Sequence, residues 1–307
     1  MEHVYDLIII GSGPAGLSAA IYAQRARLDT LILEASYVSG GQVVNTYEVD
    51  NYPGLPGISG MELGSTLRAH ADRLESRFAR EKVLELELEG KIKTVRTRKN
   101  QYQARTLILA MGAGHRKLSV PGEEEFAGMG VSYCATCDGA FFKDKVTAVV
   151  GGGDVAAEDA IFLARGCRKV YLIHRREELR AAKILQETVL GLENVEPVWN
   201  SVVTEIQGEG QVKNLKIRNV RTGEAGDLPV DGCFIAVGIK PNSELAAGKL
   251  EMDEGGYIRA GEDGATSVAG VFAAGDIRTK QLRQIITAAA DGANCVTSVQ
   301  KYLLSCR

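Results

Sequence analysis

The sequence lacks the features that mark several specialised classes of protein. Its six cysteines are too few for a disulfide framework, and a reducing compartment would keep most of them as thiols. It has no run of like charges, and a formal net charge of −3 gives no field that attracts nucleic acid or an anionic membrane. No apolar stretch approaches the roughly 20 residues that span a bilayer, and no secretory signal is recognisable. We therefore expect a cytoplasmic protein that binds neither nucleic acid nor membrane.

What the sequence does contain is a large apolar fraction and many glycines. The 307 residues, 45% of them hydrophobic, are enough for about two globular domains. The 35 glycines cluster directly after apolar runs. This placement indicates backbone that approaches ligands closely, not flexible linkers.

The first glycine cluster predicts a dinucleotide-binding unit. A buried parallel strand is expected at residues 7–10, followed by the spacing G-x-G-x-x-G at Gly11, Gly13 and Gly16. A small-residue helix and a second strand, residues 30–33, come next. Glu34 lies 23 positions after Gly11, where an acid can hold the hydroxyls of an unphosphorylated adenosine ribose. A glycine motif alone would be weak, but strand, helix, strand and acid together favour dinucleotide binding over a ligand-free βαβ unit.

The chain then repeats this pattern with a different ending. A strand at 146–150 precedes Gly151, Gly153 and, in the third position, Ala156. After a second strand at 169–173, the position that matches Glu34 is His174, and cationic side chains follow: Arg175, Arg176 and Arg180. Guanidinium groups bind a ribose 2′-phosphate that a carboxylate would repel, so this unit is predicted to prefer NADPH. A solvated basic loop is the alternative interpretation.

The order of these units predicts an α/β fold with two Rossmann-like (three-layer ββα) nucleotide-binding domains. Each glycine-rich turn, here called a cradle, is followed by a stretch in which apolar and polar residues alternate as in β-strands. A buried strand ending in glycine comes next. Asp276 lies at the carboxyl end of a later predicted strand, and ligands bind at this end of the strands in open α/β sheets. We predict a discontinuous first domain, residues 1–112 and 241–307, with the second inserted as residues 113–240.

Between the two cradles lies a C-x-x-C pair, Cys134 and Cys137, which could be half a zinc site, a structural disulfide or a redox pair. Zinc needs four ligands, but the chain has no second C-x-x-C and its histidines at 3, 70, 115 and 174 are unpaired, so we predict no metal site. A structural disulfide is disfavoured by the compartment and by the tiny loop that it would close. The small loop makes the pair reducible, which favours a redox role.

Over essentially all 307 residues the chain resembles low-molecular-weight, prokaryotic-type thioredoxin reductases of the two-dinucleotide-binding-domain flavoprotein family. The motifs that carry this resemblance are GSGPAG (11–16), GGQ (40–42), NYPG (51–54), CATCDG (134–139), GGGDVAAEDA (151–160), HRREELRA (174–181), AAGDIR (273–278) and RQIITAAADG (283–292). The resemblance implies a homodimeric flavoprotein that passes hydride from NADPH through FAD to its own cysteine pair, and reduces the disulfide of thioredoxin.

The same resemblance assigns the cofactor contacts. For FAD these are Gly11, Gly13, Gly16, Glu34, Gln42, Asn51, Gly112, Asp276, Arg283 and Gln284. For NADPH they are Gly151, Gly153, Ala156, Glu158, His174, Arg175, Arg176 and Arg180. One departure is Met111, which stands where the family often has threonine and cannot donate a hydroxyl hydrogen bond.

For catalysis, the resemblance assigns Cys137 to the flavin side and Cys134 to attack on the partner disulfide. Asp138 is the expected acid–base group, with a helix N-cap as its alternative role. The family's solution for access to both nicotinamide and partner is domain rotation, here with hinges expected near residues 112–114 and 238–240. Alternative functions are a related flavin/dithiol enzyme with another electron partner, either a peroxiredoxin-system reductase or a small-molecule dithiol oxidase, and a flavin-bound redox sensor.

Overall fold

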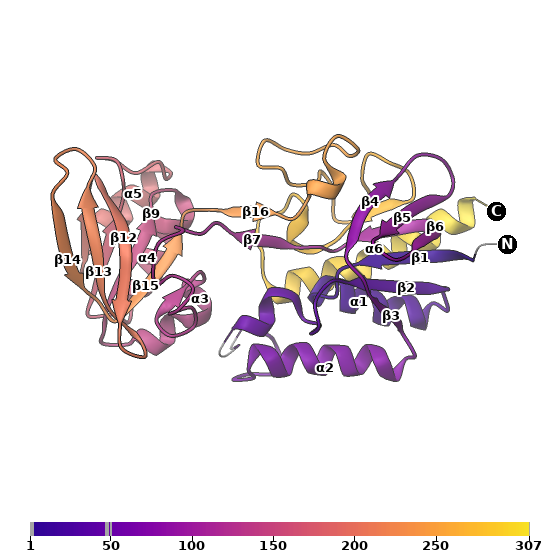
Figure 1. The fold of residues 1–307 in the computed structure, drawn as a ribbon, viewed down its shortest axis with the longest axis horizontal. Helices are drawn as coiled ribbons and strands as arrows, with labels where there is room; N and C mark the ends of the chain where they lie inside the picture. The colour runs from indigo at the N-terminus through magenta and orange to yellow at the C-terminus, as the bar shows by residue number, and fades with distance from the viewer. Residues whose placement is uncertain (1–2, 47–48, 50, 307) are drawn as a thin grey trace. The chain divides into compact units, whose positions relative to one another are not determined.

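The chain folds into two units in the computed structural model, which describes residues 3–46, 49 and 51–306. The first unit comprises residues Met1–Gly114 and Lys240–Arg307, and the second comprises His115–Ile239. The chain crosses from one unit to the other in β7 (Ala113–His115) and returns in β16 (Ile239–Pro241), and these two short strands pair with each other (Figure 1).

The first unit is built on a seven-stranded sheet of order β3-β2-β1-β6-β5-β4, with β17 also paired to β6. The strands β3, β2, β1, β6 and β17 are parallel, whereas β5 is antiparallel to β6 and β4 is antiparallel to β5. The strands are β1 Val4–Ile10, β2 Thr30–Glu34, β3 Arg77–Arg80, β4 Val83–Glu87, β5 Lys93–Thr97, β6 Gln101–Leu109 and β17 Val271–Ala273. The predicted strands at 7–10 and 30–33 are therefore confirmed, each slightly longer than expected.

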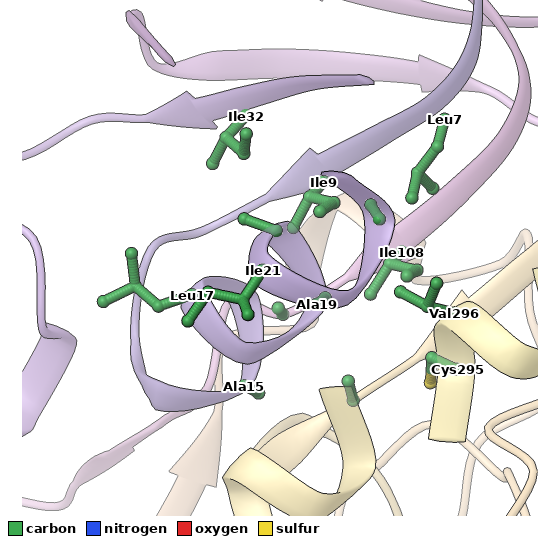
Figure 2. Close-up of a cluster of buried hydrophobic side chains, with 14 of the residues drawn as sticks. Leu7, Ile9, Ala15, Leu17, Ala19, Ile21, Ile32, Ile108, Cys295 and Val296 are labelled. Carbon is green, nitrogen blue, oxygen red and sulfur yellow. The ribbon is translucent and has the colours of Figure 1, made fainter. Parts of the chain in front are cut away.

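Helices α1 (Pro14–Arg25) and α6 (Ile285–Ser305) pack against each other beside this sheet. Small residues on α1 let the two helices approach closely. Figure 2 shows Leu7 and Ile108 from the sheet, Ala19 from α1 and Val296 from α6 within one buried cluster. The unit is completed by α2 (Gly60–Arg73) and by three short 3₁₀ turns, η1 Gly41–Asn45, η3 Glu244–Ala246 and η4 Gly275–Ile277.

The second unit repeats the design on a five-stranded parallel sheet of order β11-β10-β9-β15-β8. Its strands are β8 Val131–Ser132, β9 Val146–Gly151, β10 Lys169–Ile173, β11 Val195–Val198 and β15 Gly232–Ala236. A separate antiparallel sheet contains β12 Ser201–Gly208, β13 Val212–Asn219 and β14 Ala225–Pro229. The helical elements are α3 Ala135–Asp138, η2 Gly139–Phe142, α4 Asp154–Ala164 and α5 Lys183–Leu190.

These two units confirm the predicted fold class of two Rossmann-like α/β domains. In both, a strand with four or more buried residues leads through glycines into a helix whose small side chains are buried. The continuous burial explains why the strands read as apolar runs and not as alternating patterns. Among the residues described, no helix combines the length and the apolar character needed to cross a membrane.

Candidate active site

The first glycine cradle has the geometry of a phosphate-binding turn. Gly11 has φ +102°, and its N–H donates to the carbonyl of Leu33 at 2.8 Å. A Cβ on Gly16 would overlap the carbonyl of Gly11, so helix and strand approach closely only because residue 16 is glycine. Gly13 is the N-cap of α1 and no side chain caps the helix there. The N-terminal N–H groups of α1 can therefore bind an anion such as a pyrophosphate.

Glu34 is fixed at the carboxyl end of β2 by three hydrogen bonds. Its Oε2 accepts from the backbone N–H of Ser12 at 2.8 Å and from the Ser12 hydroxyl at 2.7 Å, while Oε1 accepts from the N–H of Ser36 at 2.8 Å. Ser12 thus ties the predicted ribose-binding acid directly to the phosphate-binding turn. The sequence motif had indicated only the glycines around this serine, which is fully buried.

Of the other predicted residues of the first unit, the fold brings Asn51 and Gln284 together. Asn51 Nδ2 donates to Gln284 Oε1 at 3.0 Å, although the residues are far apart in sequence. The Arg283 guanidinium lies over the ring of Tyr257, 4.0 Å from its centroid. Gln42 is exposed in η1.

The segment around Met111 is held through its backbone. Asn242 Nδ2 donates to the carbonyl of Met111 at 2.8 Å, and the Asn242 N–H donates to the carbonyl of Gly112 at 3.0 Å. Gly112 has φ +67°, a conformation that glycine adopts without steric cost. The missing threonine hydroxyl is therefore not replaced by a side-chain donor from residue 111.

Asp276 follows β17 and presents an unsatisfied oxygen. Its Oδ1 is buried and has no hydrogen-bond partner within the described ranges. Burial raises the pKa of this carboxyl, while Lys280 and Arg283 act in the opposite direction. A buried acceptor without a partner fits a ligand hydroxyl, so this oxygen and the open turn at Gly13 together fit a dinucleotide such as FAD.

A buried ion cluster supports the turn that carries Asp276. Asp291 on α6 accepts from the backbone N–H of Gly275 at 2.8 Å and from Lys280 Nζ at 2.9 Å through Oδ2. The Arg278 guanidinium pairs with both of its oxygens, at 2.6 and 2.9 Å. Burial works against ionisation of Asp291, but the hydrogen bonds from Arg278 and Lys280 hold its pKa below the ordinary value.

The second cradle differs from the first in what lies beneath it. A Cβ on Gly151 would overlap the carbonyl of Ala236 and the Ala156 methyl, so β9 and α4 approach closely only because residue 151 is glycine. His174 occupies the position that matches Glu34, but the residue is only 5% exposed and its ring lies against Gly152. Its Nε2 has no hydrogen-bond partner among the residues described. Burial, followed by the positive charges of Arg180, Arg175 and Arg176, lowers the pKa of His174.

The three arginines, in contrast, are exposed. None forms an ion pair with another described residue of the chain. The backbone N–H of Arg180 donates to the carbonyl of Gly152 at 2.6 Å, which holds the basic segment against the cradle. Glu158 is exposed on α4, two residues after Ala156. Unpaired guanidinium groups beside a glycine turn fit a phosphorylated ribose.

Cys134 and Cys137 form a disulfide at the start of α3. The Asp138 carboxyl next to it does not cap the following 3₁₀ turn; its Oδ2 instead accepts from the Ser132 hydroxyl at 2.5 Å. Burial raises the pKa of Asp138, and the hydrogen bond from Ser132 acts in the opposite direction. An acid with a raised pKa beside a disulfide can exchange protons with the sulfurs of the reduced pair.

A second buried carboxylate organises the chain just before the disulfide. Glu123 is 1% exposed and accepts from the Tyr133 hydroxyl at 2.7 Å and from the backbone N–H groups of Leu118 and Ser119 at 3.0 and 2.6 Å. The Tyr133 ring stacks on His115, with 5.1 Å between centroids. The sequence does not indicate Glu123, and its only signal for Ser132 is a polar residue two positions before Cys134.

Comparison with known proteins agrees with this geometry. Residues 5–292 match the family model described as pyridine nucleotide-disulphide oxidoreductase. The chain is 46% identical over 310 aligned positions to a thioredoxin reductase of Peptoclostridium acidaminophilum, with 99% of this chain and 98% of the relative covered. It is 46% identical to the thioredoxin reductase of Bacillus subtilis, with 98% and 96% covered.

Among solved structures, the thioredoxin reductase of Streptococcus pyogenes matches with a TM-score of 0.93 and 44% identity, covering 99% of this chain and all of that one. Family model, curated relatives and structure agree over almost the whole length. The chain therefore belongs to the low-molecular-weight thioredoxin reductases of the pyridine nucleotide-disulphide oxidoreductase family.

Proposed function

We propose that this thioredoxin reductase uses NADPH, through bound FAD, to reduce its Cys134–Cys137 disulfide and then the disulfide of thioredoxin. Family membership implies FAD and NAD(P)H as cofactors. The choice of NADPH rests on the three exposed arginines beside the second cradle, and thioredoxin as substrate rests on the relatives' names. The observation that carries the proposal is the disulfide flanked by Asp138, in the same unit as the basic cradle.

The residues that would hold FAD are those of the first unit. Gly11, Gly13 and Gly16 would bind the pyrophosphate, Glu34 the adenosine ribose, and Asp276 a hydroxyl of the ribityl chain. The remaining contacts near the flavin would come from Gln42, Asn51, Gly112, Arg283 and Gln284. Bound FAD would supply the two-electron chemistry that links a nicotinamide to a disulfide.

The residues that would hold NADPH belong to the second unit. Gly151, Gly153 and Ala156 would form the pyrophosphate turn, and Glu158 would lie beside it on the first turns of α4. Arg175, Arg176 and Arg180 would bind the 2′-phosphate. His174 would act from below the turn, since its side chain is packed against Gly152.

Reduction of the disulfide needs two electrons and converts each sulfur to a thiolate, which can then accept a proton. Cys137 would receive the electrons, and Cys134 would leave as a thiolate. Asp138 would protonate it, and would take the proton back before Cys134 attacks the partner disulfide. Attack forms a mixed disulfide and releases one partner thiolate; Cys137 then attacks Cys134 and releases the second, which regenerates the Cys134–Cys137 bond.

Rotation of the second unit would let the cysteine pair and the nicotinamide take turns at the flavin. Gly112 and Gly238, each one residue before a chain crossing, have φ of +67° and +115°, and glycine can absorb further dihedral change there. A crosslink between the units that left turnover unchanged would contradict rotation. We also propose that the enzyme is a cytoplasmic homodimer; sedimentation of the purified holoenzyme tests the oligomeric state, and cell fractionation tests the compartment.

An anaerobic reduction experiment tests the proposed function. The FAD-loaded enzyme should lose its yellow colour on addition of NADPH, and oxidised thioredoxin should restore it. Failure of NADPH to bleach the enzyme would contradict the proposal. Recovery by oxygen or a small disulfide, but not by thioredoxin, would identify a dithiol oxidase or a reductase of another partner.

A further inference from the structure

Ser132 occupies a special position beside the disulfide. It ends strand β8, is 6% exposed, and lies two residues before Cys134. Its Oγ is 2.5 Å from Asp138 Oδ2, and it accepts the backbone N–H of Cys134 at 3.1 Å. One hydroxyl thus joins the proposed acid–base residue to the backbone of the cysteine that attacks the partner.

The direction of the Ser132–Asp138 hydrogen bond follows from competition for a single proton. The other acceptor within reach of the hydroxyl is the carbonyl of Cys134, at 3.3 Å. That carbonyl already accepts the N–H groups of Cys137 and Asp138, at 3.2 and 3.1 Å. The shorter distance and the free capacity of the carboxylate favour donation to Asp138.

Donation to Oδ2 distinguishes the two oxygens of Asp138. Oδ2 must remain an acceptor, because the hydroxyl has no equally good alternative. Oδ1 is buried and has no hydrogen-bond partner in the part of the chain that the structure describes. We infer that Ser132 is a positioning residue that fixes Oδ2 of Asp138 as an acceptor and thereby assigns the acid proton to Oδ1.

This inference rests on the proposed acid–base role of Asp138, and it names the oxygen that carries the acid proton. The Oδ1–H group would give its proton to a thiolate of the reduced pair, and the carboxylate so formed would keep the Ser132 hydrogen bond through Oδ2. Because Ser132 also holds the N–H of Cys134, the acid and the attacking cysteine would keep their relative placement when the disulfide opens.

Ser132 is the main polar group that affects the pKa of Asp138. Burial raises the pKa of Asp138, and the Ser132 hydrogen bond is what opposes it. Helix α4 and turn η2 pack against α3. The α4 helix carries Asp154, Glu158 and Asp159, and η2 carries no titratable side chain. Burial raises the pKa of Asp159 to about 7, and the charge of Glu158 adds to the shift.

The test follows proton exchange at the cysteines without using turnover. The holoenzyme is reduced with dithiothreitol, freed of reductant, and alkylated with iodoacetamide over a range of pH. Asp138→Asn identifies the inflection in the Cys134 alkylation rate that belongs to the carboxyl. In Ser132→Ala this inflection should move to higher pH by about one unit, because the carboxylate loses a hydrogen bond.

Matched variants separate positioning from general damage. Ser132→Thr keeps the hydroxyl and should restore the wild-type inflection. Ser201→Ala removes a hydroxyl of equal burial, 6% exposed, that donates to a backbone carbonyl of Trp199, and should leave the inflection unchanged. If Ser132→Ala does not fold, Ser132→Val compared with Ser132→Thr gives the same contrast of methyl against hydroxyl.

Two results would overturn the inference, and they differ in what else they affect. If Asp138→Asn has a clear effect but the inflection in Ser132→Ala does not move, only the positioning role of Ser132 is rejected. If Asp138→Asn has the same pH dependence of Cys134 alkylation as wild type, the acid–base role of Asp138 is rejected as well. Neither result bears on the bleaching of the enzyme by NADPH, which tests the proposed function separately.

Discussion

The imidazole of His174 lies against Gly152, the middle of three consecutive glycines in the second cradle, so closely that a Cβ on residue 152 would overlap the ring. Both residues are buried. The cradle is therefore supported from below by a side chain, where the first cradle has the Ser12–Glu34 hydrogen bonds at the corresponding place.

Replacing Gly152 with alanine should lower the free energy of unfolding by about 1–3 kcal/mol, because the new methyl must displace a buried ring. Urea denaturation measures the loss. The control is Gly166→Ala, where a Cβ meets no protein atom within 4 Å and φ is not positive. Adding His174→Ala to Gly152→Ala should cost less than the two single losses combined. Equal stability of Gly152→Ala and Gly166→Ala would show that the ring does not constrain residue 152.

The arginines beside the second cradle should decide between NADPH and NADH. Arg175→Ala and Arg176→Ala should each raise the KM for NADPH about tenfold or more, since each removes a charge-assisted hydrogen bond to the 2′-phosphate. The KM for NADH, which has no such phosphate, should change little. Steady-state kinetics with both nucleotides measures this, with the exposed Arg168→Ala as control. Equal losses with NADH and NADPH would argue for a solvated basic loop.

Removing the carboxylate from the buried ion cluster on α6 should be among the most destabilising single changes in the first unit. Asp291→Ala leaves Arg278 and Lys280 buried without their shared carboxylate, and should cost about 3–5 kcal/mol of unfolding free energy. Asp72→Ala is the control, since Asp72 pairs with Arg68 at the surface and should cost about 1 kcal/mol or less.

The same cluster predicts a pH dependence with a definite sign. The folded pKa of Asp291 lies below its unfolded value of about 3.9, so its contribution is complete above that pH and is lost as the pH falls toward the folded value. The difference between wild type and Asp291→Ala should therefore shrink below about pH 4. A difference that stayed constant through this range would mean that the ionised carboxylate is not what stabilises the cluster.

The sequence predicted the strand–glycine–helix units because their signals are local. Buried parallel strands need unbroken apolar runs, and a phosphate-binding turn needs glycine at fixed offsets, so strands at 7–10 and 169–173 could be located from composition and spacing alone. The resemblance of the whole chain to a known family added the cofactors and the roles of individual residues.

Side-chain partners across the fold could not be predicted in this way. The sequence grouped His174 with the arginines that follow it, but strand geometry turns its ring beneath Gly152 and leaves the arginines exposed. Asp138 had a helix N-cap as its alternative role, and only the three-dimensional structure reveals Ser132 as its partner. Such contacts depend on the direction in which each side chain leaves its element, which composition and spacing do not encode.

The central claim is that electrons leave the enzyme through the Cys134–Cys137 pair, and serine variants test it most directly. NADPH-dependent reduction of thioredoxin disulfide is measured for wild type, Cys134→Ser, Cys137→Ser and, as a control, Cys306→Ser, which replaces an exposed cysteine outside the pair. Turnover should fall to background in both variants of the pair and should persist in Cys306→Ser. Wild-type turnover in either Cys134→Ser or Cys137→Ser would contradict the mechanism.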